Sequence, residues 1–148
     1  MTRASRFPGR AAKIQVSAAA EEKYLADVAL AATFDDLLEQ ATEAERAFRH
    51  AQATGVSAAE QYPLARTLSA ALTAAMQAGY AAERAEIGPR GYDDRIYRRK
   101  AKARPEVHAL TDEAERLLTL RETYQLTGFP ARPEAAALGV QVARLPGH

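Results

Sequence analysis

The 148-residue sequence contains no cysteine and no tryptophan. Without cysteine, disulfide frameworks, thiolate zinc sites, iron–sulfur clusters and thiol catalysis are excluded, and the redox compartment stays open. No stretch approaches the roughly 20 apolar residues that a membrane-spanning helix needs, so we predict no membrane span. The apolar core of a secretory signal peptide is missing as well. We therefore expect an intracellular, soluble protein, cytoplasmic by default.

Motifs for catalysis and cofactor binding are missing too. Two glycine-rich patterns typical of phosphate-binding loops, G-x-x-x-x-G-K-[ST] and G-x-G-x-x-G, are both absent from the sequence. It also contains no G-x-S-x-G nucleophile elbow. Its three histidines, His50, His108 and His148, lie far apart, and none has the Glu-x-x-His spacing of a di-iron bundle. We predict no enzymatic activity, no cofactor, no metal site and no small-molecule substrate.

Large apolar residues are scarce, and alanine takes their place. The chain holds 35 alanines but only 27 residues of leucine, isoleucine, valine and phenylalanine together. Alanine is the best helix former and a poor strand former, which disfavours an all-β fold. We predict an all-α protein, an elongated bundle of three to four helices with a long N-terminal helix and irregular termini.

Glycine and proline are absent between Gly9 and Gly55. Ser17 is a suitable N-cap and Gly55 a natural stop, which predicts one helix over residues 18–53. Such a helix would be about 54 Å long at 1.5 Å per residue, whereas a compact globule of this size has a radius of gyration of about 15 Å. The helix must therefore bend, break or project from the rest of the protein.

Turn-forming residues divide the next part of the chain. A capping-box pattern starts at Ser57, but Pro63 would displace a hydrogen-bonded amide. We therefore predict a short turn at 58–61 and a main helix from about Pro63 to the glycines at 88–91.

Aspartates and a proline define the following elements. Asp93 or Asp94 can cap a third segment that breaks near Arg104, because the residue before Pro105 disfavours helix. A further helix starts at Pro105 and ends at a glycine cap, Gly128. The predicted regions are a basic N-terminal arm at 1–16, a helical bundle at 17–128 and a C-terminal tail at 129–148 with a short helix at 133–138.

Apolar stripes on these helices predict which residues face neighbouring helices. Gly79, within a line of alanines, indicates either close approach by another helix or a tolerated glycine. The predicted helix-interface residues are Tyr24, Val28, Leu38, Phe48, Leu68, Leu72, Met76 and Gly79.

Charge is unevenly distributed along the chain, although the net charge is only +1. Residues 1–16 hold four cations and no acid, which is typical of an organelle transit peptide or of a basic binding arm. Residues 17–62 hold nine acids against three cations, and residues 90–104 hold seven cations against two acids. The candidate residues for binding nucleic acid or an acidic partner are Arg90, Arg95, Arg98, Arg99, Lys100, Lys102 and Arg104, with Tyr92 and Tyr97 available to stack on bases.

Three interpretations of the basic segment remain open: a solvated face, pairing with acidic helices, and contact with a nucleic-acid backbone. Because alanine-rich helices have shallow apolar stripes, we expect a helical interaction or assembly protein that self-associates or serves as an accessory subunit of a larger complex. The alternative is a nucleic-acid-binding protein that uses residues 90–104 and the N-terminal arm. The isoelectric point of about 8.0 lies below the value above 9 that is usual for a dedicated nucleic-acid domain.

The surroundings of the arginines distinguish these functions. Pairing with Asp35, Glu39 or Glu43 would favour protein assembly, in one chain or between copies. An exposed stripe without acidic partners would favour nucleic acid.

Overall fold

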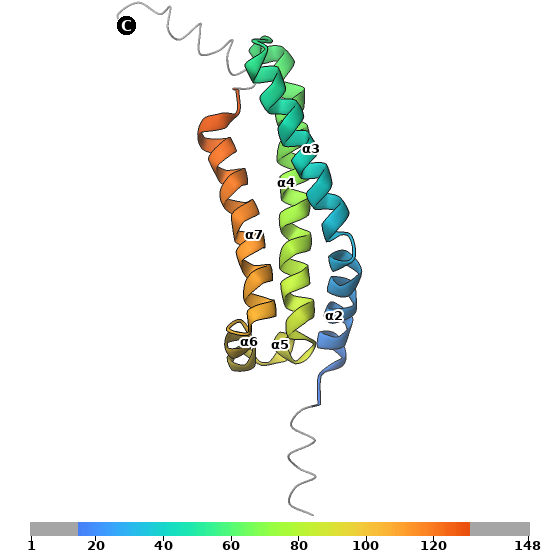
Figure 1. The fold of residues 1–148 in the computed structure, drawn as a ribbon. Coiled ribbons are helices and arrows are strands. Elements are labelled where there is room, and N and C mark those ends of the chain that lie inside the picture. Colours follow the sequence, from blue (N-terminus) through green and yellow to red (C-terminus); the bar gives the residue numbers. More distant parts are fainter. Residues whose placement is uncertain (1–14, 131–148) are drawn as a thin grey trace, which may run out of the picture. The chain divides into compact units, whose positions relative to one another are not determined.

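The computed structural model describes residues 15–130, which are helical and contain no strand (Figure 1). The helices are α2 (Ala18–Ala31), α3 (Phe34–Ala53), α4 (Ala58–Ile87), α5 (Arg90–Asp93), α6 (Arg95–Ala101), α7 (Pro105–Thr123) and the π-helix η2 (Tyr124–Gly128). The predicted all-α class is confirmed. Within the described part of the chain, no helix is both long enough and apolar enough to cross a membrane. Most of the predicted basic arm and nearly all of the predicted tail, including its short helix, lie outside the described residues.

The stretch predicted as one long helix is interrupted at Ala32 and Thr33, so it forms α2 and α3. The Leu30 carbonyl accepts hydrogen bonds from both the amide and the hydroxyl of Thr33, at 3.0 and 2.6 Å. Threonine side chains compete in this way with the backbone bonds that would continue a helix. The break replaces the predicted long N-terminal helix.

Helix α4 begins earlier than predicted, with Pro63 inside it. Ser57 caps the helix, because its hydroxyl accepts the amide hydrogen of Glu60 at 3.1 Å. Pro63 removes one donor, the partner that the carbonyl of Ala59 would otherwise have. Both residues are exposed, so water can satisfy that carbonyl at little cost. The predicted stop at Gly55 agrees with its left-handed backbone conformation, φ +74°.

The described chain forms two compact units that are discontinuous in sequence. Unit 1 contains described residues 15–34 and 77–115, and unit 2 contains 35–76 and 116–130. Each has its own buried residues. Those of unit 1 include Ala78, Ala81, Ile87, Val107 and Ala114, and those of unit 2 include Phe48, Leu68, Leu72 and Leu117.

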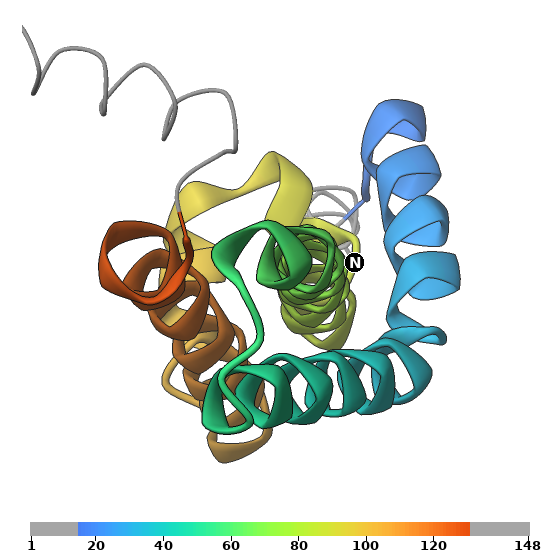
Figure 2. The same cartoon turned by 90° about the horizontal axis from the view of Figure 1, so that it is seen from above.

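Unit 2 is held by an aromatic cluster, Phe48, Tyr124 and Phe129, whose ring centroids lie 5.2–5.8 Å apart. The Tyr124 hydroxyl donates to Glu45 at 2.6 Å and accepts from Arg49 at 2.9 Å. Burial and the bond to Glu45 raise the pKa of this phenol. Figure 2 shows α3 beside the part of α4 that belongs to this unit.

The last helical segment ends at the predicted Gly128, although this glycine lacks the positive φ of a left-handed cap. The chain closes with a π-turn, in which the Phe129 amide donates to the Tyr124 carbonyl at 2.8 Å. Gly128 is needed for space, because a Cβ atom there would lie 2.7 Å from the Tyr124 ring. Phe129, which follows this glycine, stacks on the Tyr124 ring and supplies an apolar contact at the helix end.

Candidate nucleic-acid interface

The basic segment folds into two short helices of unit 1, α5 and α6. Asp94 is the N-cap of α6, and its carboxylate accepts the amide hydrogen of Tyr97 at 2.9 Å. This bond lowers the pKa of Asp94. The segment then breaks at residues 102–104 and α7 starts at Pro105, as the sequence predicts.

One face of α6 packs against the core of unit 1. Ala101 is buried with Ile87 of α4 and Val107 of α7, and Tyr97 packs against this cluster. Figure 1 shows α6 beside the start of α7. Because helical residues three and four apart share a face, this anchoring directs the neighbouring positions toward solvent.

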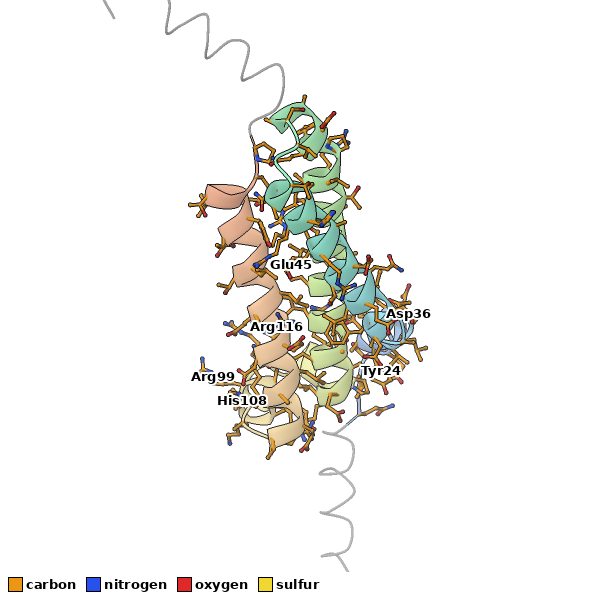
Figure 3. All side chains as sticks on the ribbon, turned by 45° about the horizontal axis from the view of Figure 1, so that its top comes forward. Tyr24, Asp36, Glu45, Arg99, His108 and Arg116 are labelled. Carbon is orange, nitrogen blue, oxygen red and sulfur yellow. The ribbon has the colours of Figure 1, made fainter. Side chains whose placement is uncertain are left out.

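The outward face of α6 is basic. Its cations recur at helical spacing and surround one hollow of about 170 Å³ whose lining contains no acid. All are exposed, and Figure 3 shows Arg99 projecting from the ribbon. The residues of this basic face are Arg95, Arg98, Arg99 and Lys102.

Lys100 is exposed on the same helix. None of these five cations has an acidic partner among the described residues of unit 1.

The two outermost cations of the predicted site do have partners. Arg90 pairs with Asp94 at 3.4 Å, and its guanidinium carbon lies 4.4 Å from the centre of the Tyr97 ring. Arg104 donates to the Glu86 carbonyl at 2.9 Å and lies 3.9 Å from the Glu106 carboxylate. These two arginines therefore stabilise the segment, whereas the five cations between them form no such bond with the described residues of unit 1.

The tyrosines proposed to stack on bases are engaged inside unit 1. Tyr97 is half-buried beneath Arg90, and the Tyr92 hydroxyl donates to Asp27 of α2. Arg84 donates to the same carboxylate, from Nε at 2.7 Å and from Nη2 at 3.1 Å. The bonds from Arg84 hold the pKa of Asp27 below its ordinary range, and burial with the Asp27 bond raises the pKa of Tyr92.

The start of the described chain is hydrogen-bonded to α5 through Ser17. Asp93 accepts hydrogen bonds from the amide and hydroxyl of Ser17, at 2.8 and 2.9 Å. Sequence reasoning missed the roles of Asp93 and Asp27, because their partners are 76 and 57–65 residues away and no local spacing indicates them.

The predicted helix-interface residues occupy different environments. Phe48, Leu68, Leu72 and Gly79 are buried, Tyr24, Leu38 and Met76 are half-buried, and Val28 is exposed. Gly79 allows a close approach, since a Cβ atom there would lie 3.2 Å from Phe34 and 3.3 Å from Ala114. Of the two interpretations of this glycine, the structure supports the close approach.

Within residues 15–130, no group of three or more histidine, aspartate or glutamate side chains is arranged to hold a metal ion. Three acids of α3, Asp35, Glu39 and Glu43, follow one another at four-residue spacing. Asp35 and Glu39 are exposed, and Glu43 pairs with Arg46 of the same helix.

No family model, curated protein or solved structure matches this chain.

Proposed function

We propose that this protein binds nucleic acid by its phosphate backbone, through the basic face of α6. One observation carries the proposal: five exposed cations on and beside a single helix have no acidic partner among the residues of unit 1 that the structure describes, and four of them surround one hollow. This is the arrangement expected of a polyanion site, not of a basic segment neutralised within its own unit.

Electrostatic repulsion among these cations also favours a polyanionic ligand. Like charges gathered on one short helix repel one another, and a chain of phosphates relieves that repulsion while releasing its condensed counterions. Arginine guanidinium groups also bind phosphate oxygens in bidentate fashion. Three of the four residues around the hollow are arginines.

A charge-reversal experiment tests the proposal. Arg98→Glu combined with Arg99→Glu should weaken binding of a fluorescent 20-nucleotide DNA at least about tenfold at 50 mM salt, measured by anisotropy. The control is Lys23→Glu combined with Arg66→Glu, which changes the net charge equally at exposed positions on α2 and α4. It should leave the affinity within about twofold.

Three results would contradict the proposal. The first is no binding by the unmodified chain at 50 mM salt, and the second is an equal loss in both double variants. The third is binding of poly-L-glutamate as tightly as DNA of matched charge, which would point to an acidic protein partner.

A second function, self-association, is favoured by a different observation. Three of the five exposed large apolar side chains in residues 15–130 belong to α2: Leu25, Val28 and Leu30. Leu25 and Val28 share a helix face with exposed Ala29 and Ala32, away from the buried Ala20. We propose that this face packs against α2 of a second copy, which would complete the burial that an alanine-rich sequence leaves shallow.

Sedimentation velocity tests the self-association. The unmodified chain should show a concentration-dependent dimer, and Leu25→Glu with Val28→Glu should abolish it. The control Leu126→Glu, at a leucine of unit 2 that is 82% exposed, should have no effect. A monomer across the whole concentration range would exclude this function and leave the nucleic-acid proposal unaffected.

A further inference from the structure

A second, larger hollow lies beside the basic face of α6. Its volume is about 600 Å³, and it is formed by the start of the described chain together with α5 and α6. The hollow shares Arg95 and Arg99 with the four-cation hollow. A group held in it would therefore be adjacent to a phosphate held on the basic face. The lining residues are Gln15, Val16, Arg90, Asp93, Asp94, Arg95, Ile96 and Arg99.

The lining is apolar as well as charged. Ile96 is 69% exposed although it lies within the basic helix α6, and half-buried Val16 also lines the hollow. Contact with these aliphatic side chains would add no binding free energy for a ligand that consists of phosphate alone. They suit a ligand that combines negative charge with an uncharged flat body.

Arg90 supplies a flat surface in the same hollow. The Tyr97 ring lies at 4.4 Å from its guanidinium carbon and the Asp94 carboxylate at 3.4 Å from its Nη2, so both partners fix the guanidinium group. The side chain is still 43% exposed. A guanidinium plane that is held in this way is a surface on which nucleic-acid bases stack.

We propose that the second hollow takes an unpaired base, stacked on Arg90 and flanked by Ile96 and Val16. The protein would then prefer single-stranded nucleic acid, because the faces of bases in a duplex are covered by their neighbours and only base edges reach the grooves. The carboxylates of Asp93 and Asp94 and the amide of Gln15 add hydrogen-bonding groups for the edge of the base. The inference rests on the proposed function, since the adjoining phosphate is held by the basic face of α6.

Three probes of equal length test the inference with the full chain: a 20-nucleotide oligo(dT), a fully abasic 20-mer with the same phosphates, and a 20-base-pair duplex. Oligo(dT) should bind about tenfold more tightly than the abasic strand, and more tightly than the duplex.

Two variants test whether the preference for oligo(dT) over the abasic strand arises at the second hollow. Arg90→Lys keeps the charge but removes the planar group, and Ile96→Ser changes an exposed side chain that the fold does not need. Each should bring the oligo(dT) affinity close to that of the abasic strand and leave abasic binding within twofold. Arg66→Lys, an exposed arginine of unit 2, is the matched control and should change neither affinity.

The possible failures are distinguishable. Equal affinity of the unmodified chain for oligo(dT) and the abasic strand would overturn the base site while the phosphate-binding proposal stands. An oligo(dT) preference that survives both variants would also overturn it, because the base would then be bound elsewhere. Failure to bind any probe at 50 mM salt would overturn both proposals.

Discussion

At the scale of single residues, cations in this protein differ by whether they have a partner. Arg84 is bound to Asp27, and Arg104 is bound to a backbone carbonyl and lies near an acid. Arg98 and Arg99, a few residues before Arg104, have neither kind of bond with residues 15–34 or 77–115. A paired arginine stabilises the fold, whereas an unpaired exposed arginine adds little to stability. Phosphate binding is therefore proposed for the unpaired residues.

Asp27 is the most consequential paired residue, since its carboxylate joins α2 to Arg84 of α4 and Tyr92 of α5. Asp27→Asn should lower the free energy of unfolding by about 1–3 kcal/mol at pH 7, because charge-assisted bonds in a mostly buried position are lost. Urea denaturation measures the change. Glu39→Gln, an exposed carboxylate on α3, is the control and should change stability by less than about 0.5 kcal/mol.

The pH dependence follows from the lowered pKa of Asp27. The unfolded chain holds the proton at higher pH than the folded chain does, so the stabilisation is complete above the ordinary carboxyl range and is lost as pH falls through the lower folded pKa. The difference between Asp27→Asn and the unmodified chain should therefore shrink below about pH 4. A difference that stays constant down to pH 2 would contradict this account.

At the scale of helices, one glycine sets how closely elements of unit 1 approach. A side chain at Gly79 would meet Phe34 and Ala114, both of which are buried. Gly79→Leu should therefore destabilise the protein by about 1–3 kcal/mol through overpacking, despite the better helix propensity of leucine. Thermal unfolding followed by circular dichroism measures this loss. Gln77→Leu, two residues away on the exposed side of α4, should cost less than about 0.5 kcal/mol, and an equal loss would disprove the close-approach explanation.

Helix α6 depends on its cap, because seven residues form too short a helix to be stable alone. Asp94→Ala should speed hydrogen exchange at the Tyr97 amide, which would lose its acceptor. Asp94→Asn retains an acceptor oxygen and should preserve most of the protection. If both variants exchanged alike, the capping role would be wrong.

Local chemistry predicted several element boundaries correctly. Gly55, the Asp94 cap and the break before Pro105 follow from backbone preferences that act within a few residues. A break of the long helix was one of three expected outcomes, but its position at Thr33 was not predicted, because a threonine that bonds to the preceding turn has no distinctive sequence pattern. The tolerance of Pro63 depends on an exposed neighbouring carbonyl, which the sequence does not reveal.

The candidate site was predictable only in part. Clustering of cations in residues 90–104 is visible in the sequence, whereas the hollow that four of them surround is seen only in the structure. Their division into bonded and unbonded residues was not predictable, since it depends on Glu86, Tyr97 and the packing of α6 on α4 and α7.

At the scale of the whole molecule, the small net charge of +1 conceals a strongly basic segment and a strongly acidic one. Overall isoelectric point is therefore a poor guide to binding here, because a polyanion responds to the local field near the surface within about 10 Å at ordinary salt. We propose that the local field at α6 binds nucleic-acid phosphates.

The salt dependence of oligo(dT) binding tests that claim most directly. Engagement of four or five phosphates predicts that log K falls against log salt with a slope of about −3 or steeper, which is about a sixtyfold loss of affinity between 50 and 200 mM. Arg98→Gln with Arg99→Gln should make the slope shallower by about 1.4, whereas Lys23→Gln with Arg66→Gln should leave it unchanged. A slope near zero, or the same slope in both double variants, would contradict the account.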